Sequence, residues 1–323
     1  MSSESMRIGF GRGLVIAGQA NDKVVALSAD LAESTGFSQF QEAMPGRYIE
    51  VGVAEQNLVT VASGLAHVGW RPYVASYAAF SPGRNWEQIR TTIGINNQPV
   101  TIVGTHAGLN VGPDGATHQA LEDTALMRVM PNMAVMSPGD STEAEQVAIS
   151  LANYDKPAYV RLAREKTEQF LDSEPFVVGK AKRLREGSDV ALIGTGTMTY
   201  VLIRAAELLE QRGISAEVLH VPTIKPLDED AILESAKKCG RVVVAEEAQI
   251  AGGFCGAVAE LLSEKLPMPV KRIGVDDRYG QTGTAGELLE LYGLSFDQIA
   301  TDITEFINKM PQYHQEDKNG TNN

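Results

Sequence analysis

One loop of the chain combines two of its five histidines with an acid and several glycines. His106, Asp114 and His118 all lie in the stretch 105–119, and the glycines in or beside it are Gly104, Gly108, Gly112 and Gly115. An imidazole exchanges protons near neutral pH, and glycine lets the backbone approach a ligand closely. Two other readings stay open. One is a zinc site, although no cysteine and no His-x-x-x-His helix accompanies the pair; the other is a surface loop whose histidines bond nearby backbone groups.

A second candidate is Glu55 in the run EVGVAEQN, between a predicted strand and a predicted helix. The carboxyl ends of parallel strands are where open α/β sheets bind ligands. A carboxylate in the first turn of a helix is also stabilised by the helix macrodipole, without any catalytic role. Glu55 is therefore either a ligand-binding acid or an ordinary residue of a helix start.

Aromatic side chains gather near the end of a later strand, at Tyr77, Phe80 and Trp86, together with Arg84. Their rings could stack on a flat heterocycle, because offset stacking of aromatic groups is favourable. The same residues could instead be part of the hydrophobic core.

Two further features follow strands. Arg161 and Arg164 could anchor an anionic substrate, because a guanidinium group binds oxyanions with paired hydrogen bonds, although surface arginines often bind nothing. The run GTGTMT at residues 194–199 resembles a dinucleotide-binding fingerprint but has Thr199 where the third glycine should be. We interpret it as a tight turn from a strand to a helix.

The elements that position these residues alternate along the first half of the chain. Apolar runs bounded by turn residues predict strands at 24–31, 48–52, 72–80, 100–105, 133–137 and 157–162. Residues 54–67 show helical spacing of apolar side chains, and Asp140 with Glu143 resembles a capping box at the start of a helix over 142–154.

The pattern breaks over residues 166–187, which are polar and contain Pro and Gly. Strands are predicted again at 190–194, 216–220, 241–245 and 270–274, and the pairs Thr284/Glu287 and Ser295/Gln298 predict two more helix starts. Strands separated by helices require mostly parallel pairing. The sequence therefore predicts an α/β protein of two doubly wound, mostly parallel sheet domains over 1–172 and 188–312, with a linker at 173–187 and a disordered tail at 313–323.

Composition excludes several classes of function. The 323 residues are 43% hydrophobic and 21% charged, with a net charge of −13, which disfavours nucleic acid and anionic membranes as partners. Cys239 and Cys255 are too few for a disulfide framework. No apolar run approaches the roughly 20 residues of a membrane span, and the start MSSESMRIGF lacks the pattern of a signal peptide. A cytoplasmic protein is expected.

Taken together, these motifs resemble a known family. The run GVAEQN with its helix, the segment 69–72, the aromatic stretch and the spacing TH-x₇-DG-x-THQ are similar to the pyrimidine-binding domain of transketolases and 1-deoxyxylulose-5-phosphate synthases. The second half resembles their carboxyl-terminal domain. GVAEQN is shared more widely among thiamine-diphosphate enzymes, including beta subunits of 2-oxoacid dehydrogenases, whereas the two-histidine loop favours the ketol-handling branch.

The resemblance implies thiamine diphosphate as the cofactor. Glu55 would bind N1′ of its aminopyrimidine ring and favour the imino tautomer, whose nitrogen can take a proton from the thiazolium carbon. Phe80, or Tyr77 as its rival, would stack on the pyrimidine, and Arg84 belongs to the same cofactor-binding segment. The divalent metal, Mg²⁺ or Ca²⁺, is not expected to be held by residues of this chain.

The resemblance also implies contacts with a sugar phosphate. His106 and His118 would bond substrate hydroxyls and the carbonyl oxygen and move protons. Other substrate contacts implied are Asp114 and Asp30 for hydroxyls or the edge of the site, Ser34 and Arg7 for the phosphate, and one of Arg161 and Arg164, between which the alignment does not choose.

The same families hold the diphosphate and the metal in a preceding domain with a GDG motif and a later Asn, and this combination is missing here. The sequence analysis therefore predicts that a second polypeptide, an amino-terminal transketolase subunit, completes the active site in an α₂β₂ assembly.

The predicted function is that of the carboxyl-terminal subunit of a split transketolase, which transfers a two-carbon ketol unit from a ketose phosphate to an aldose. The alternatives are a 1-deoxyxylulose-5-phosphate synthase-like or specialised ketol transferase acting on a branched or sulfonated sugar, a 2-oxoacid dehydrogenase beta subunit, and a non-catalytic binding module.

Overall fold

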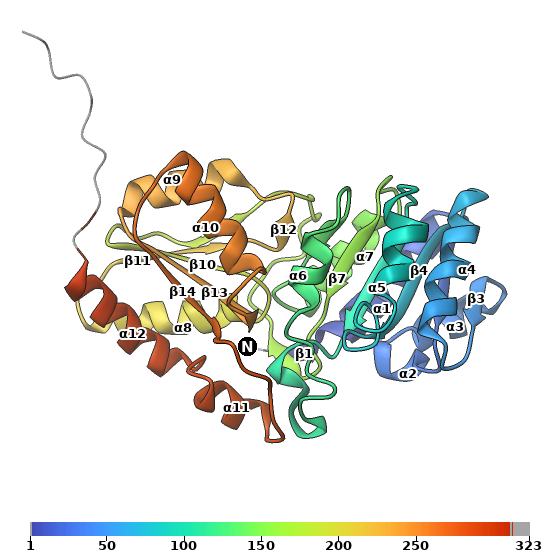
Figure 1. The fold of residues 1–323 in the computed structure, drawn as a ribbon, viewed down its shortest axis with the longest axis horizontal. Helices are drawn as coiled ribbons and strands as arrows, with labels where there is room; N and C mark the ends of the chain where they lie inside the picture. Colours follow the sequence, from blue (N-terminus) through green and yellow to red (C-terminus); the bar gives the residue numbers. More distant parts are fainter. Residues whose placement is uncertain (1, 311, 313–323) are drawn as a thin grey trace, which may run out of the picture.

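The computed structural model describes residues 2–310 and 312, which form two α/β units side by side (Figure 1). Each unit is built on a mostly parallel sheet with helices on both faces. The predicted fold class, two doubly wound and mostly parallel sheet domains, is confirmed. The predicted tail at 313–323 lies outside the described residues.

The first sheet has seven strands in the order β12-β6-β7-β5-β4-β2-β3. All neighbouring strands pair in parallel except β12, which pairs antiparallel with β6. Carboxyl ends of parallel strands meet at one edge of a sheet, so the segments that follow β3, β4 and β5 are brought together. The strands are β2 (Val24–Ser28), β3 (Tyr48–Glu50), β4 (Arg71–Tyr77), β5 (Thr101–Thr105), β6 (Ala134–Met136), β7 (Ala158–Arg161) and β12 (Thr223–Lys225).

Alternate residues of this sheet pack against helices on its two faces. Leu27 and Leu58 belong to the core of one face, whereas Ala26 and Phe10 belong to the core of the other. The helices of this unit are α1 (Met6–Ala20), α2 (Ala32–Thr35), α3 (Ser38–Ala43), α4 (Glu55–His67), α5 (Trp86–Gln88), α6 (Asp123–Arg128) and α7 (Ser141–Leu151), with the 3-10 helices η1 (Pro45–Arg47) and η3 (Leu109–Asp114) and the π-helix η2 (Ile89–Gly94).

Helix α1 was not predicted from the sequence, because its glycines disfavour an isolated helix. Its packing against α7 explains them. A Cβ atom on Gly9 would lie 2.0 Å from the carbonyl oxygen of Ser141, and one on Gly13 would lie 2.2 Å from that of Glu145. The glycines therefore let the two helices approach closely, and tertiary packing overrides the weak local propensity.

The second sheet has five strands in the order β14-β13-β10-β11-β9, with β9 antiparallel to β11 and the other pairs parallel. Thr284 forms the predicted capping box with Glu287, and α12 begins directly after Ser295, as predicted. The elements are β9 (Lys182–Arg185), β10 (Val190–Gly194), β11 (Ala216–His220), β13 (Val242–Gln249), β14 (Val270–Val275), α8 (Met198–Gln211), α9 (Glu229–Cys239), α10 (Phe254–Lys265), α11 (Ala285–Leu291) and α12 (Phe296–Lys309).

Short strands near the boundary of the two units pair with segments far away in the sequence. Residues 182–185, which the sequence analysis places in the linker, form β9 at the edge of the second sheet. Strand β12 lies in the second half of the chain but completes the first sheet. Near the amino end, β1 (Ser3–Ser5) pairs antiparallel with β8 (Lys166–Glu168). These pairings join segments far apart in the sequence, which local patterns do not reveal.

Candidate active site

Glu55 is the first residue of α4, just after β3. Its side chain is only 3% exposed, and its Oε2 atom accepts a hydrogen bond of 2.8 Å from Nη1 of Arg84. The backbone carbonyl of Glu55 accepts a 2.8 Å bond from Nδ2 of the fully buried Asn85, which also donates to Ser81. The Glu55 side chain thus lies at the positive end of the α4 macrodipole and is paired with the Arg84 cation.

Four rings lie next to one another at the ends of β4 and β5. Tyr77 stacks on His106 with 3.9 Å between ring centroids and lies 5.8 Å from Phe80. The ring of His118 packs against Phe80 and Tyr77 in T-shaped geometry, with 5.4 Å and 6.3 Å between ring centroids. The guanidinium carbon of Arg84 lies 4.8 Å from the centre of the Phe80 ring. The structure thus brings the aromatic segment, both loop histidines and, through Arg84, the buried Glu55 to one edge of the sheet.

His106 is buried and has a positive backbone φ of 53°, which places its ring beneath Tyr77. Its Nδ1 atom lies 3.1 Å from Oγ1 of Thr105. Burial lowers the pKa of His106 to about 3, with smaller contributions from the positive charges of Arg7 and Arg164. His106 is therefore neutral at physiological pH, so it can donate one hydrogen bond and accept another but carries no charge.

The loop that follows β5 bends at three glycines with positive φ, Gly108, Gly112 and Gly115. Asp114 closes the 3-10 helix η3 and is exposed, so its carboxylate faces solvent rather than the ring cluster's interior. Gln119 is buried and donates to the carbonyl groups of Gly112 and Gln281, which attaches the loop to the second unit.

Arg7 lies near the amino end of α1, and its contact with Ser34 joins two of the predicted substrate residues. Arg7 donates a 2.7 Å bond from Nη1 to the carbonyl oxygen of Ser34, while its buried Nε has no hydrogen-bond partner within the described chain. Asp30 is exposed and adopts a positive φ of 62°, with its backbone N–H bonded to Glu50. Ser34 is half-buried in the short helix α2.

Arg164 and Arg161 occupy different environments. Arg164 donates to the carbonyl oxygen of Val111 and lines an open cavity of about 580 Å³ together with Arg7, Lys166 and Gln169. Arg7 and Arg164 are also close enough to His106 for their positive charges to contribute to the lowering of its pKa. The lining of the cavity combines three cationic side chains with the carboxylates of Glu4 and Glu165.

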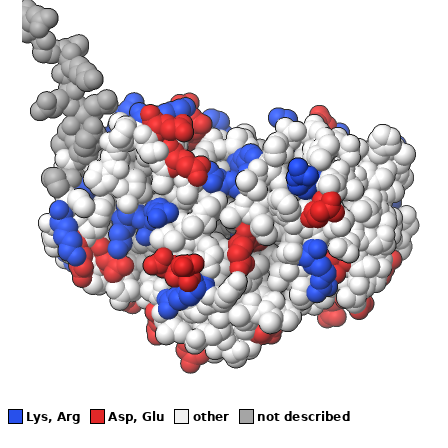
Figure 2. Space-filling model, in the orientation of Figure 1, with Lys and Arg blue, Asp and Glu red and all other residues white. Residues whose placement is uncertain are grey.

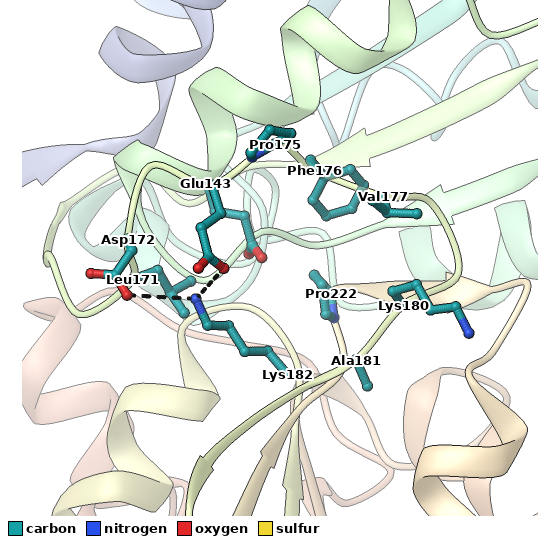
Figure 3. A pocket seen from close by; sticks show the side chains of 11 residues that line it. Glu143, Leu171, Asp172, Pro175, Phe176, Val177, Lys180, Ala181, Lys182 and Pro222 are labelled. Atoms are coloured by element: carbon teal, nitrogen blue, oxygen red, sulfur yellow. Dashed lines mark hydrogen bonds and ion pairs between the residues drawn. The ribbon is translucent and has the colours of Figure 1, made fainter.

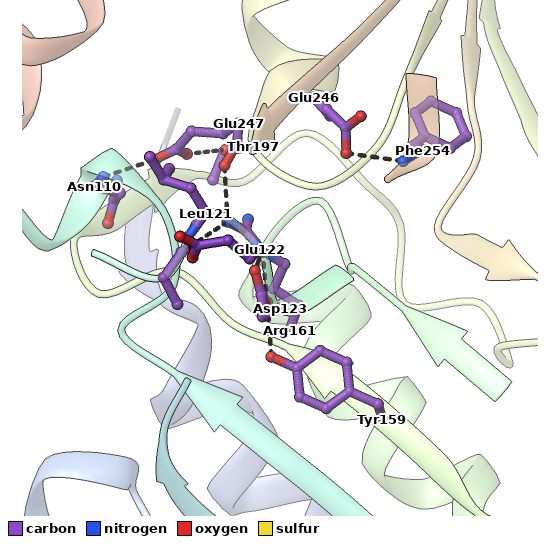
Figure 4. Close-up of polar contacts among 11 residues, drawn as sticks. Asn110, Leu121, Glu122, Asp123, Tyr159, Arg161, Thr197, Glu246, Glu247 and Phe254 are labelled. Atoms are coloured by element: carbon purple, nitrogen blue, oxygen red, sulfur yellow. Dashed lines mark hydrogen bonds and ion pairs between the residues drawn. The ribbon is translucent and has the colours of Figure 1, made fainter. Parts of the chain in front are cut away.

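Arg161 is buried between the two units instead (Figure 4). Its Nε donates to both carboxylate oxygens of Asp123, at 3.0 and 3.2 Å, and its Nη2 donates to the backbone oxygen of Glu247 at 2.8 Å. Tyr159 donates a further 2.7 Å bond to Asp123. The guanidinium of Arg161 thus connects β7 to β13. Arg161 does not line the cavity that holds Arg164.

Two buried acids beside Arg161, Glu246 and Glu247, were not identified as candidate site residues from the sequence. The side chain of Glu247 accepts bonds from the backbone N–H of Asn110 and the hydroxyl of Thr197. Its neighbour Glu246 accepts two bonds from the first backbone N–H groups of α10, at Phe254 and Cys255. Burial raises the pKa of both glutamates. No sequence signal marks them, because their partners lie far away along the chain.

Another hollow lies beside the boundary of the two units (Figure 3). It measures about 170 Å³, and its charged groups are already paired, because Lys182 contacts both Asp172 and Glu174. At its inner end Glu143 bonds Nε2 of the buried His220 at 2.8 Å. These contacts hold the linker region and β11 against α7 rather than present free groups to a ligand.

Other features add little to this site. Within the described residues there is no cluster of three His, Cys, Asp or Glu side chains that could bind a metal ion. None of the described helices has the length and apolar character needed to span a membrane. On the face drawn in Figure 2, acidic and basic side chains are interspersed and form no broad basic patch.

Comparison with known proteins decides the family. The model of the transketolase pyrimidine binding domain matches residues 3–169, and that of the transketolase C-terminal domain matches residues 179–299. The chain belongs to the transketolase family. The resemblance noted in the sequence is therefore confirmed at the level of the family and its two domains, and this family implies thiamine diphosphate.

Relatives cover nearly the whole chain. A putative transketolase C-terminal section of Methanocaldococcus jannaschii is 42% identical over 95% of this chain and 97% of its own length. A 6-deoxy-6-sulfo-D-fructose transketolase subunit of a Clostridium species is 41% identical over 89% of this chain and 90% of its own length. The 1-deoxy-D-xylulose-5-phosphate synthase of Prochlorococcus marinus is 38% identical over 93% of this chain, which spans 48% of that enzyme.

One solved structure has a similar sequence and a similar fold. It is described as a split gene transketolase, inactive beta4 tetramer, and is 41% identical with a TM-score of 0.88. The match covers 94% of this chain and 98% of that one.

Proposed function

We propose that this chain is the carboxyl-terminal subunit of a two-subunit, thiamine-diphosphate-dependent transketolase. In this role it transfers a two-carbon ketol unit from a ketose phosphate to an aldose or aldose phosphate, as in pentose phosphate metabolism. The observation that carries the proposal is that Arg84 contacts both the buried carboxylate of Glu55 and the Phe80 ring, while His106 and His118 pack against Tyr77 and Phe80 of the same aromatic group. A carboxylate and an aromatic face fit the edge and the plane of an aminopyrimidine.

Glu55 would hold a proton in a hydrogen bond to N1′ of the pyrimidine, and Phe80 would stack on the ring. We favour Phe80 over Tyr77 because Tyr77 already stacks on His106 at 3.9 Å. Thiamine diphosphate, when bound, supplies the nucleophilic carbon that carries the two-carbon unit. Arg84 lies against both Glu55 and Phe80, at the place proposed for the pyrimidine ring.

The substrate would lie between the histidines and the cavity that holds Arg7 and Arg164. His106, neutral and buried, and His118, half-buried, would bond the carbonyl and hydroxyl oxygens of the sugar. Arg7 and Arg164 would bind its phosphate, which the burial of Arg161 in the interdomain network supports. The exposed carboxylates of Asp30 and Asp114 and the hydroxyl of Ser34 would contact sugar hydroxyls or phosphate at the rim.

A second subunit would supply the residues for the diphosphate and for Mg²⁺ or Ca²⁺. This part of the proposal is supported by two relatives that this chain covers almost completely, one named a C-terminal section and the other a subunit. The similar structure, described as an inactive tetramer of beta chains, also agrees with a need for an additional partner. We propose an α₂β₂ complex with its active sites between unlike chains, working in the cytoplasm.

The direct test combines the chain with its amino-terminal partner, thiamine diphosphate and Mg²⁺, and supplies xylulose 5-phosphate and ribose 5-phosphate. Formation of sedoheptulose 7-phosphate is expected only when both polypeptides are present. Activity of the chain alone, or no turnover of these sugars by the complex, contradicts the proposal.

A second candidate has specific support from the relatives. One of them is a 6-deoxy-6-sulfo-D-fructose transketolase subunit, and others are 1-deoxy-D-xylulose-5-phosphate synthases. The same complex should therefore also be offered a sulfonated ketose, and pyruvate with glyceraldehyde 3-phosphate. Turnover of only one of these sets would assign the chain to a specialised ketol transferase or to a synthase-like enzyme.

A further inference from the structure

The side chain of Arg84 joins the two groups that form the proposed pyrimidine site. Its Nη1 atom donates a 2.8 Å bond to Oε2 of Glu55, and its guanidinium carbon lies 4.8 Å from the centre of the Phe80 ring. A guanidinium group is flat and carries N–H donors in its plane. Such a group can bond a carboxylate through its edge while its cation lies over an aromatic ring, and a protonated heterocycle can use the same two partners.

An aminopyrimidine bound in the proposed way needs the same two partners. Its N1′ edge would use the Glu55 carboxylate, and its plane would use the Phe80 ring. We propose that the Arg84 guanidinium is an internal substitute for the pyrimidine, which competes with the cofactor for Glu55 and Phe80 and has to move aside when the cofactor binds. This inference rests on the proposed function and concerns the regulation of the same site.

Burial explains why the molecule needs such a substitute. Glu55 is 3% exposed, and a buried carboxylate without a partner is strongly destabilising, whereas a paired one is tolerated. Arg84 supplies the positive partner. Its own side chain is 51% exposed, so it can leave the carboxylate for water without losing its hydration.

Neighbouring contacts allow Arg84 to move while Glu55 stays in place. Asn85 is fully buried and bonds the backbone oxygen of Glu55 and the hydroxyl of Ser81. The start of α4 is therefore fixed to the turn that carries Arg84 by a residue other than Arg84. Only the exposed part of the arginine side chain has to change its position.

A different role would give the opposite result. If Arg84 supported Glu55 throughout turnover, its removal would weaken cofactor binding, because the carboxylate would be misplaced or partly protonated. If Arg84 competes, its removal strengthens binding. The sign of the change in the dissociation constant separates the two roles, and it does not depend on the activity of the loaded enzyme.

The experiment compares the native complex with a complex carrying Arg84→Met, a side chain of similar length without charge. Thiamine diphosphate is titrated with saturating Mg²⁺ and followed by calorimetry. We expect about a five- to tenfold lower Kd for Arg84→Met, which is the range for losing a partly exposed ion pair and a cation–π contact. Arg90→Met is the matched control, because Arg90 is exposed and lies six residues further along the chain.

Ionic strength provides a second measurement. Salt screens a partly exposed ion pair, so the Glu55–Arg84 bond is easier to break at high salt. The ratio between the Kd values of the native and Arg84→Met complexes should therefore shrink towards one as the salt concentration rises. Salt effects on the cofactor's own charges are common to both proteins and cancel in this ratio.

The outcomes are distinct. Equal or weaker cofactor binding by Arg84→Met, with the native complex binding normally, overturns the competition between Arg84 and the cofactor and leaves the proposed function intact. A native complex that binds no thiamine diphosphate overturns the proposed function and this inference together. Tighter binding in Arg90→Met as well as in Arg84→Met would show a nonspecific charge effect and would also overturn it.

Discussion

The rings of Tyr77 and His106 lie face to face, with 3.9 Å between their centroids. This contact joins the end of β4 to the loop after β5 and covers an imidazole that is almost fully buried. The consequence is chemical, because a histidine under an aromatic ring and near two arginines is kept in its neutral form. In the proposed site, His106 would therefore act through its hydrogen bonds rather than through a charge.

The first prediction concerns the pH dependence of stability. The pKa of His106 is lowered to about 3, below its ordinary value of about 6.5, so the unfolded chain binds this proton more readily. The stability that His106 contributes is present above pH 6.5 and is lost as the pH falls towards 3. When the pH is lowered from 7 to 4.5, the free energy of unfolding should fall in both proteins. The fall should be about 2 kcal/mol smaller in His106→Asn than in the native chain.

Urea unfolding at the two pH values measures this difference. His67→Asn is the control, since His67 is exposed. Parallel stability curves for the native chain and His106→Asn would contradict the prediction.

The second prediction concerns Glu55. Glu55→Gln keeps the size of the side chain but removes the charge that pairs with Arg84 and that would hold a proton for N1′. The kcat of the reconstituted complex should fall by about 10²- to 10⁴-fold, the usual contribution of a general acid–base group. Initial rates at saturating cofactor measure this loss, with Glu87→Gln, a nearby exposed position, as the control. Activity within a factor of two of the native complex would assign Glu55 a structural role only.

The third prediction concerns Arg164 in the open cavity. Arg164→Met removes one of the cations that would bind the substrate phosphate, so KM for a phosphorylated ketose should rise about tenfold, a typical value for one charged hydrogen bond. The KM for the same ketose without phosphate should stay unchanged. Steady-state kinetics with both donors provide the test, and an equal change for both donors would argue against a phosphate contact.

The fourth prediction concerns the buried network of Arg161. Arg161→Met leaves the carboxylate of Asp123, which is 1% exposed, without its cationic partner. Breaking a buried ion pair in this way costs about 3 to 5 kcal/mol, so the free energy of unfolding should fall by that amount. Chemical denaturation measures it, with Arg164→Met as the paired control that should stay near the native value. If both variants were equally stable, the separation of roles between the two arginines would be wrong.

The fifth prediction concerns Glu247. Burial raises the pKa of Glu247, so the folded state favours its protonated form, and the stability it contributes is present at low pH and is lost as the pH rises through that raised value. Glu247→Gln keeps partners for Asn110 and Thr197 but cannot ionise. The variant should therefore lose less stability than the native chain between pH 5 and pH 8 in urea unfolding. A steeper loss in the variant would contradict the assigned direction.

Local patterns along the chain determined the alternation of strands and helices, and through it the parallel sheets. Because parallel strands end at one edge, the position of Glu55 after a strand marked it as a candidate ligand-binding acid, whereas a shared site with Tyr77 and His106 was implied by the resemblance to the family. Capping residues such as Thr284 marked helix starts, since their bonds join neighbouring residues. These features depend on contacts within a few residues or on the period of the pattern, both of which are visible in the sequence.

Only the tertiary structure decided which charged groups meet. Arg161 bonds the backbone of Glu247, 86 positions away, and Arg84 bonds Glu55, 29 positions away. The pairing of β12 with β6 in the first sheet and the close contact of α1 with α7 also join segments that lie far apart in the sequence. Such pairings are set by how the packed sheets and helices fill space, and an arginine that binds a buried acid looks in the sequence like one that faces a substrate.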